Sequence, residues 1–376
     1  MANIIDYVKW RGDLKLRESK FNEIDSLILN RFSYFPLDSI IKENEIVSIK
    51  ELSERFQEEN KGEIEVLWKD DAELFPIMGK SKRFGEMMAL EYINKVELEI
   101  QKQFSAITVI LPDNTIYVSY RGTDNTLIGW KEDFNMSFKS HIASQISAKE
   151  YLENIAKKYP DKKIRIGGHS KGGNLAVYAS IFASAAVKKR IINVYNDDGP
   201  GFNEDIINTE EYKKSINKVI TYIPQDSIFG RLLNHKEKYT VVQSIEKGVM
   251  QHDVYSWQVI GRSFIVLEEV TNESKFIDKT ITNWLKNLDL QTREQVIDIV
   301  FEIINSTEAK TINDLKLSVM KNAKIILSSY KHIEPENKKM IIATIAELVE
   351  IIKANVKEEY KNNISQKRKN LFESKI

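Results

Sequence analysis

A serine flanked by glycines is the part of this chain best suited to chemistry. Residues Gly168-His169-Ser170-Lys171-Gly172 fit the pattern G-x-S-x-G. In this pattern the serine occupies a tight, strained turn, and glycine is needed on both sides because a Cβ would collide with its neighbours. The pattern is typical of a nucleophile elbow, which exposes a serine hydroxyl for attack on a carbonyl carbon.

The sequence around Ser170 provides the context that such an elbow requires. Lys163–Gly167 is a short β-type run that follows the turn at Tyr159-Pro160-Asp161. Leu175–Ala183 is rich in small residues and predicts a helix that packs closely on a sheet. A glycine-rich turn with an idle serine is the alternative, and the strand–turn–helix context disfavours it.

Composition excludes several other kinds of chemistry. The chain has 376 residues, of which 42% are hydrophobic and 29% charged, and its formal net charge is +0. This balance gives no reason to expect nucleic acid or an acidic partner. There are no cysteines, so disulfides and thiolate metal sites are excluded. The length suits one large α/β domain with an appendage, or two domains.

The N-terminal sequence and the hydropathy pattern predict a cytoplasmic protein. Asn3–Asp13 carries charges where a signal peptide needs an apolar core. No apolar run approaches the roughly 18–20 residues of a membrane span. We therefore expect no transmembrane segment.

Helical patterns precede the first strands of the predicted core. Asn22-Glu23-Ile24-Asp25 opens a helix, and Ser48-Ile49-Lys50-Glu51 has the spacing of a capping box. A third helix is predicted around Phe84–Ile93. We expect these N-terminal helices to cover an edge of the central sheet.

Strands and helices then alternate. Phe104–Leu111 and Thr115–Tyr120 read as a hairpin, and Ser147-Ala148-Lys149-Glu150 is a capping-box match that starts a helix. Three further β-type runs follow the elbow, at Ile191–Tyr195, Lys218–Ile223 and Tyr239–Gln243. The alternation predicts an α/β fold with a mainly parallel central sheet covered on both faces.

The pattern changes near Asn272 and becomes helical to the end. Thr292-Arg293-Glu294-Gln295 caps one predicted helix, and the polar, basic tail Lys361–Ile376 is predicted to be partly disordered. The other predicted helices cover Phe276–Leu285, Leu315–Leu327 and Met340–Val356. We therefore divide the chain into a domain over residues 1–271 and a C-terminal helical subdomain over 272–376.

The sequence suggests two alternative roles for the helical subdomain. Its apolar stripes, with Ile277, Ile281, Trp284 and Leu288 among them, suit packing on the core, which is the more common role. The alternative is a lid over an apolar acyl pocket.

Two sets of residues carry a family resemblance. Tyr120-Arg121-Gly122-Thr123 with Trp130 and Asp133, followed by Gly168–Gly173, resembles the class 3 (fungal-type) lipase branch of α/β-hydrolases. Asn3–Asp13 and Gln251–Trp257 resemble an uncharacterised bacterial family related to those lipases. The resemblance implies an α/β-hydrolase fold and ester hydrolysis, and it supplies no substrate.

The nucleophile needs a general base, because a serine hydroxyl is a poor nucleophile near neutral pH. In α/β-hydrolases the base follows the serine and the acid in chain order, which leaves His235, His252 and His332. We choose His252, which follows the last β-type run and lies where the resemblance places the base. His235, in charged surroundings, is the close rival. His169 reads as a turn or packing residue.

The acid that orients the base has two candidates. Asp226 follows the run Lys218–Ile223, and a loop at a strand's carboxyl end is where α/β sheets place working residues. Asp226 also matches the position of the acid in the resembling lipases, and it is our choice. Asp197 and Asp198 follow the preceding strand and are the alternative, although Asp before Gly-Pro also favours a plain turn.

Acyl transfer also needs donors for the developing oxyanion. The amide of Lys171, directly after the nucleophile, supplies one by the geometry of the elbow. The resemblance assigns the second to Thr123, through its amide and also its hydroxyl. A polar β-turn is the plain reading of Arg121–Asp124, and Trp130 and Asp133 are expected to brace this loop.

The sequence therefore predicts a serine hydrolase that cleaves a carboxylic ester, with a small acyl ester or lipid as substrate and no cofactor. An acyltransferase or thioesterase would use the same residues. A non-catalytic interaction protein that docks through the helical C-terminus is the alternative of another class. Metal hydrolysis and nucleotide binding are disfavoured, since neither H-E-x-x-H nor a P-loop spacing occurs. The oligomeric state is not predicted.

Overall fold

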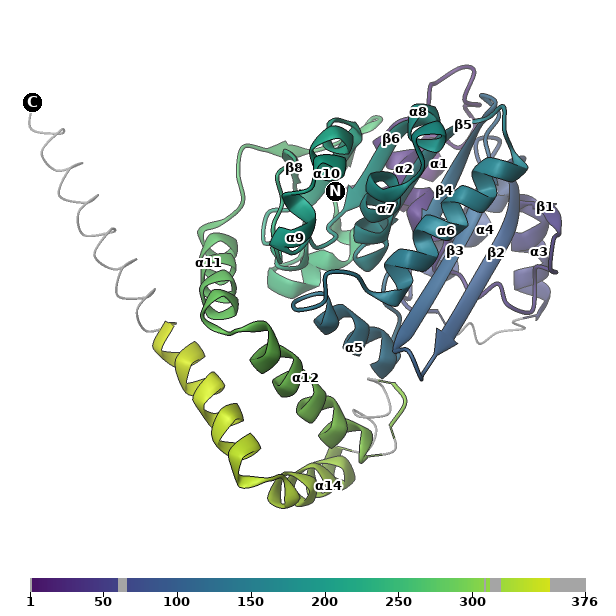
Figure 1. Cartoon of the computed structure of the whole chain (residues 1–376). Coiled ribbons are helices and arrows are strands. Elements are labelled where there is room, and N and C mark those ends of the chain that lie inside the picture. Colours follow the sequence, from purple (N-terminus) through teal and green to yellow (C-terminus); the bar gives the residue numbers. More distant parts are fainter. Residues whose placement is uncertain (1, 60–65, 308, 312–318, 352–376) are drawn as a thin grey trace, which may run out of the picture. The chain divides into compact units, whose positions relative to one another are not determined.

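The structure is a computed structural model that describes residues 2–59, 66–307, 309–311 and 319–351 (Figure 1). The chain divides into two compact units. The first comprises residues 1–271 together with 310–312, and the second comprises 272–309 and 313–376. Each unit is described by itself.

A nine-stranded sheet forms the centre of the first unit. Its order is β1-β2-β3-β4-β5-β6-β7-β8-β11, with β4 to β8 parallel and the pairs at both edges antiparallel. The strands are β1 (Ile46–Ser48), β2 (Met88–Glu97), β3 (Lys102–Ile110), β4 (Thr115–Tyr120), β5 (Lys163–His169), β6 (Ile191–Asp197), β7 (Val219–Pro224), β8 (Tyr239–Val242) and β11 (Val266–Leu267). A separate two-stranded ribbon pairs β9 (Val259–Ile260) with β10 (Ser263–Phe264). The predicted α/β fold is confirmed, and its parallel pairs lie in the middle of the sheet.

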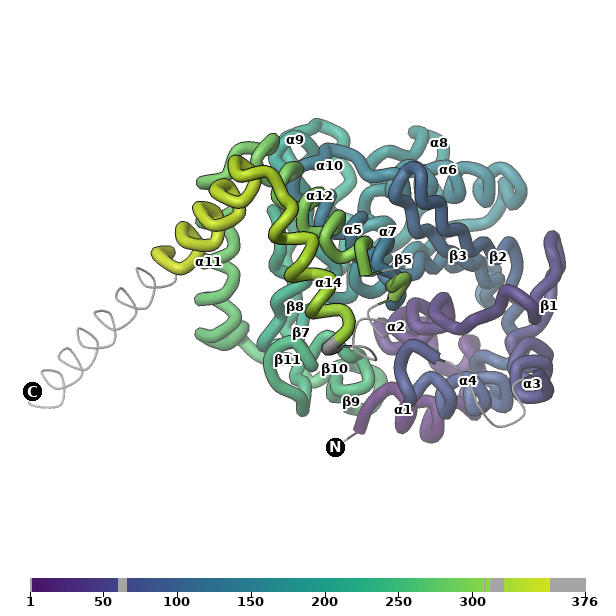
Figure 2. The backbone as a smooth tube through the Cα atoms, turned by 90° about the horizontal axis from the view of Figure 1, so that it is seen from below, coloured from purple at the N-terminus to yellow at the C-terminus, as the bar shows by residue number. Residues whose placement is uncertain are grey.

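Helices cover both faces of the sheet, as Figures 1 and 2 show. One layer contains α1 (Ile4–Arg11), α2 (Glu23–Phe32), α3 (Ile49–Glu59) and α4 (Asp71–Lys80), and the other contains α6 (Ala143–Lys158), α7 (Lys171–Phe182), α8 (Ala185–Arg190) and α10 (Glu210–Ser215). Alternate side chains of β4 enter different cores: Tyr117 packs with the N-terminal helices, whereas Ile116 and Val118 pack with α6 and α7. Burial of apolar side chains on both faces is the main stabilising term for such a sheet.

Short helices complete the first unit. They are α5 (Leu127–Asn135), α9 (Glu204–Ile207) and the 3₁₀ turns η1 (Ile216–Lys218), η2 (Phe229–Arg231), η3 (Gly248–His252) and η4 (Val254–Ser256). Several of these follow the carboxyl ends of the parallel strands, which is where α/β proteins place their working loops.

The N-terminal helices begin where their capping residues predict. The Asn22 side chain accepts from the amides of Ile24 and Asp25, and the Ser48 hydroxyl accepts from the amide of Glu51. The prediction that they cover an edge of the sheet is confirmed for α3, which contacts the edge strand β1, and is wrong for α2, which packs on the face of the sheet over β4 and β5.

Two other predictions from sequence are wrong, one about the type of an element and one about where a helix begins. The helix predicted around Phe84–Ile93 is largely strand β2, which pairs with β3 over most of its length. A bulge between Leu90 and Ile93, with Glu91 at φ +53°, breaks the two-residue alternation that would reveal a strand. The capping box predicted at Ser147–Glu150 lies inside α6, whose first turn is capped earlier by the Gln145 side chain on the Ile142 amide.

The second unit is helical, as predicted. It contains α11 (Asn272–Asn287), α12 (Leu290–Asn305), α14 (Val319–His332) and a helix over 335–351. The start predicted for α12 at Thr292 is one turn late, because the Asp289 side chain caps the helix by accepting from the Thr292 amide at 2.8 Å. Residues 315–318 and the tail Lys361–Ile376 lie outside the described residues. Among the helices that the structure describes, none has the length and apolar content to cross a membrane.

Candidate active site

Ser170 lies at a strained junction between β5 and α7. Its backbone has φ +59° and ψ −135°, a region that residues other than glycine rarely adopt. The Ser170 amide donates to the carbonyl oxygen of Asp197 at 2.9 Å, which ties the turn to the end of β6. A Cβ added to Gly168 would lie 2.2 Å from the backbone of Gly172, so the two glycines allow the turn to close. The predicted strand, turn and helix are therefore observed.

His252 is paired with an aspartate, and that aspartate is Asp198. His252 Nδ1 lies 2.6 Å from Asp198 Oδ2. The imidazole ends η3 and packs between the rings of Phe229 and His169, with centroid distances of 4.3 and 4.4 Å. The bond to Nδ1 fixes the ring and directs the free Nε2 elsewhere, which is the arrangement of a general base held by an acid.

The carboxylate of Asp198 is buried and accepts several hydrogen bonds. It is 1% exposed, and its other oxygen, Oδ1, accepts from the Ser227 hydroxyl at 2.5 Å and the Gly230 amide at 3.1 Å. Its backbone has φ +52°, directly after β6. Three hydrogen bonds thus compensate the burial of one carboxylate.

Asp226, the acid chosen from the sequence, does not contact His252. Its Oδ2 accepts from the Gly248 amide at 3.0 Å and Gln251 Nε2 at 2.9 Å, and its Oδ1 accepts from the Thr271 hydroxyl at 2.7 Å. These bonds brace the loop that carries His252. His252 is therefore paired with Asp198, which the sequence left as the alternative, and not with Asp226.

Ser170 and His252 lie at the same end of the sheet. His169, the neighbour of Ser170, contacts His252 both through its ring and through a bond of 2.9 Å from Nε2 to the His252 carbonyl oxygen. Within the described part of the chain, neither the Ser170 hydroxyl nor His252 Nε2 makes a hydrogen bond. Catalytic hydrogen bonds in unliganded enzymes are often long and tighten when substrate binds.

His169 supports the loop that carries His252, a role that the sequence pattern did not reveal. Burial, with His252 and Arg31 nearby, holds the pKa of His169 well below its usual range, so the ring is neutral. A carbonyl oxygen only accepts, so Nε2 carries the proton. The Tyr34 hydroxyl lies 3.1 Å from the His169 carbonyl oxygen and accepts from the Gly122 amide at 3.0 Å. Tyr34 thus joins the elbow to the loop that contains Thr123.

The predicted oxyanion donors belong to neighbouring backbone segments. A Cβ added to Gly122 would lie 3.0 Å from Ser170 Cβ, so the loop before Thr123 lies directly against Ser170. The Thr123 hydroxyl donates to Asp133 Oδ2 at 2.5 Å, so the loop contacts a side chain predicted to brace it. Among the described residues, the amides of Thr123 and Lys171 have no hydrogen-bond partner.

The remaining histidines have other partners. His235 Nδ1 lies 2.9 Å from Glu237, and His141 Nδ1 lies 2.9 Å from the Tyr178 hydroxyl. His332 is exposed at the end of α14. Neither His235 nor His332 is bonded to Asp198 or Asp226.

The two stretches that carry the bacterial resemblance meet in space. The Asn3 side chain donates to the Tyr255 carbonyl oxygen at 3.0 Å, and the Val259 amide donates to the Ala2 carbonyl oxygen at 2.9 Å. The N-terminus therefore holds the segment that follows His252.

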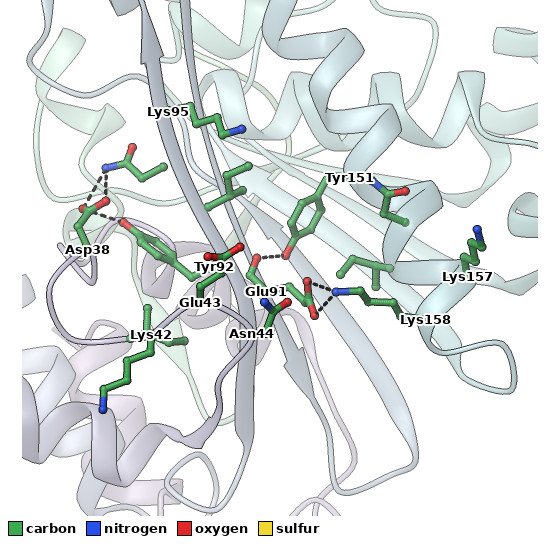
Figure 3. A pocket seen from close by; sticks show the side chains of 15 residues that line it. Asp38, Lys42, Glu43, Asn44, Glu91, Tyr92, Lys95, Tyr151, Lys157 and Lys158 are labelled. Carbon is green, nitrogen blue, oxygen red and sulfur yellow. Dashed lines mark hydrogen bonds and ion pairs between the residues drawn. The ribbon is translucent and has the colours of Figure 1, made fainter.

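A groove of about 840 Å³ lies elsewhere on the first unit (Figure 3). Its lining comes from β2, α6 and the segment before β1, and includes both acidic and basic side chains. Glu91 pairs there with Lys158, and Asp38 accepts from Tyr92 and Asn94. None of the site residues named above lines it, so we do not place the chemistry in this groove.

The central parallel strands, the strained elbow and the covering helices define an α/β-hydrolase-type fold. A family model described as Mbeg1-like matches residues 78–302, more than half of the sequence. The chain belongs to this family.

Solved structures with detectable similarity include fungal lipases. The Rhizomucor miehei lipase propeptide complex is 14% identical over 42% of this chain, with a TM-score of 0.33, and only 58% of its own length is covered. Lipase II from Rhizopus niveus is 17% identical over 42% of this chain and 67% of its own, with a TM-score of 0.33. The lipase from Rhizopus microsporus var. chinensis is 16% identical over 64% of this chain and 88% of its own, with a TM-score of 0.35. These overlaps are low, and the fold assignment rests on the sheet and the elbow. The comparison with curated proteins found no match.

Proposed function

We propose that the chain is a serine hydrolase that cleaves a carboxylic ester, with Ser170 as nucleophile, His252 as general base and Asp198 as the acid. The observation that carries this proposal is the 2.6 Å pair between His252 Nδ1 and Asp198 beside a strained elbow serine. The chain order Ser170, Asp198, His252 is the order of α/β-hydrolases.

The proposed reaction has two halves. Ser170 Oγ attacks the ester carbonyl carbon while His252 Nε2 takes its proton, and the amides of Thr123 and Lys171 stabilise the oxyanion. His252 then gives the proton to the leaving alcohol oxygen, which leaves an acyl group on Ser170. Water then attacks the acyl carbon while His252 takes a proton from it, and His252 returns that proton to Ser170 Oγ as the carboxylic acid product leaves.

The substrate class is an acyl ester or lipid, and its chain length is left to experiment. A thioester substrate or an acceptor other than water would use the same residues, so the proposal covers the acylation step in either case. The rival of another class is an interaction protein without activity. A strained serine beside a buried His–Asp pair favours the enzyme, because a scaffold needs neither.

The test is turnover of p-nitrophenyl esters of increasing chain length by the wild type and by Ser170→Ala. The matched control is Ser180→Ala, since Ser180 is a buried serine on α7 whose hydroxyl donates to the Val177 carbonyl oxygen. We expect Ser170→Ala to lose about 10³-fold or more in kcat and the control to keep its rate. Fluorophosphonate should label the wild type at Ser170. No turnover and no labelling of the folded wild type would contradict the proposal and favour the scaffold.

A further inference from the structure

We propose that Lys171 is a positioning residue. Its buried ammonium group fixes the nucleophile elbow to the Thr123 loop, so that the two oxyanion donors keep their positions relative to each other. This inference rests on the proposed function. The amide of Lys171 is one of the two predicted donors, and its side chain reaches toward the residues that hold the other.

The Lys171 side chain is completely buried. It is 0% exposed, and its Nζ donates to the Gln103 carbonyl oxygen at 3.1 Å, to Gln103 Oε1 at 2.8 Å and to Glu132 Oε2 at 2.9 Å. A lysine is almost never fully buried unless it is paired. Three acceptors match the three protons of an ammonium group, which offsets the cost of removing it from water.

Glu132 connects this lysine to three elements. It lies on α5, is 1% exposed, and accepts from the amides of Gln103 on β3 and Ser144 on α6 as well as from Lys171. Charge-assisted bonds in a buried setting are strong and have little freedom. The side chain that follows the nucleophile is therefore fixed to α5, which begins just after the Thr123 loop.

Asp133 connects Lys171 to the Thr123 loop. Its Oδ2 accepts from the Thr123 hydroxyl at 2.5 Å, and its Oδ1 lies 3.7 Å from Lys171 Nζ. That Oδ1 is buried and has no hydrogen-bond partner among the described residues. Burial raises the pKa of Asp133 to about 6, and Lys171 acts against that rise. Above this pH the carboxylate is ionised and attracts the Lys171 ammonium group.

The charged cluster of Lys171, Glu132 and Asp133 thus connects both donor residues, through the Lys171 side chain and through the Thr123 hydroxyl. An oxyanion hole is effective only when its donors are already in place before the charge develops. A loosened Lys171 would let the elbow amide and the Thr123 amide move independently. The transition state would lose stabilisation while binding of the uncharged ester is nearly unaffected.

The experiment compares kcat and KM of the full chain for one p-nitrophenyl ester in three variants. Lys171→Met/Glu132→Gln removes the buried lysine–glutamate ion pair as a whole, so that neither of these two partners is left unpaired, and Asp133 keeps its bond to Thr123. Asp133→Asn, whose side chain is 26% exposed, keeps the Lys171–Glu132 pair and leaves the core intact. Lys218→Met is the control, because Lys218 Nζ is bound to the carbonyl oxygens of Lys188 and Ile191 next to the amino end of β7.

We expect kcat to fall about 10²-fold in the double variant and about tenfold in Asp133→Asn, each with KM changed less than about twofold. Lys218→Met should keep both constants. Folding is checked by near-ultraviolet circular dichroism. If the double variant fails to fold, Asp133→Asn alone decides.

Wild-type kcat in a folded double variant or in Asp133→Asn would overturn the positioning role while the proposed function stands. A loss that appears in KM instead of kcat would also overturn it, since that indicates a deformed binding surface. A wild type without Ser170-dependent turnover would overturn the proposed function, and this inference with it.

Discussion

Replacing Asp197 by asparagine should stabilise the protein, and more so as the pH rises. Asp197 ends β6 directly before Asp198, and both are 1% exposed. Asp198 receives three hydrogen bonds, whereas the Asp197 side chain receives one, from Asn30 Nδ2 at 2.7 Å. Asp197 therefore has little to offset the cost of burying its charged form.

The magnitude follows from the shifted pKa. Burial raises the pKa of Asp197 from 3.8 to about 7, with the charge of Asp198 adding to the rise and the Asn30 bond opposing it. The native state therefore holds a proton between about pH 4 and 7 that the unfolded chain has released, so stability falls as the pH rises through this window. The difference of about three pH units corresponds to about 4 kcal/mol at 1.36 kcal/mol per unit.

Asparagine is neutral in both states and retains an oxygen that can accept from Asn30. The stability of Asp197→Asn relative to wild type should therefore rise by about 3 kcal/mol between pH 5 and 8. The assay is urea unfolding of both proteins at pH 5, 6, 7 and 8, followed by near-ultraviolet circular dichroism. Asp161→Asn, at an exposed aspartate, is the control. A stability difference that stays constant across these pH values would refute the reasoning.

Two other substitutions test the site and its support. Asp198→Asn should lower kcat for esters by about 10³–10⁴-fold, because it leaves His252 without its acid, whereas Asp226→Asn should affect stability more than turnover; equal losses in kcat would contradict the assignment. Arg31→Met should destabilise the fold by about 3–5 kcal/mol in urea unfolding, because it leaves the buried Asp71 carboxylate without the guanidinium that now bonds both of its oxygens. A smaller loss would mean that the Tyr255 hydroxyl, which also donates to Asp71, suffices to hold it.

The elbow was predictable from sequence because adjacent residues determine it. Gly168, Ser170 and Gly172 carry their own steric requirement, and the strand and helix on either side have clear patterns. The acidic partner of His252 was not predictable in this way. Asp198 and Asp226 both follow parallel strands, and only the loop that brings His252 back to β6 decides between them.

The error at β2 has a similar origin. Glu91 takes a left-handed backbone at a bulge, and the alternation of β2 is interrupted there. Pairing with β3, the next strand along the chain, and with β1, which is distant in sequence, determines the strand. The residue pattern within a ten-residue window does not show which strands pair with it, so tertiary pairing overrides the local prediction.

The N-terminal helices are part of the site's support and not an addition to it. From α2, Asn30 reaches Asp197 and Arg31 reaches Asp71, and just beyond this helix Tyr34 joins the elbow to the Gly122 amide. From α4, Asp71 accepts from Tyr255, three residues after His252. Each segment that the proposed chemistry needs is thus bonded to the first 71 residues. A nucleophile, a base and an oxyanion loop that come from distant parts of the chain can keep one geometry because a single buried polar framework holds them all.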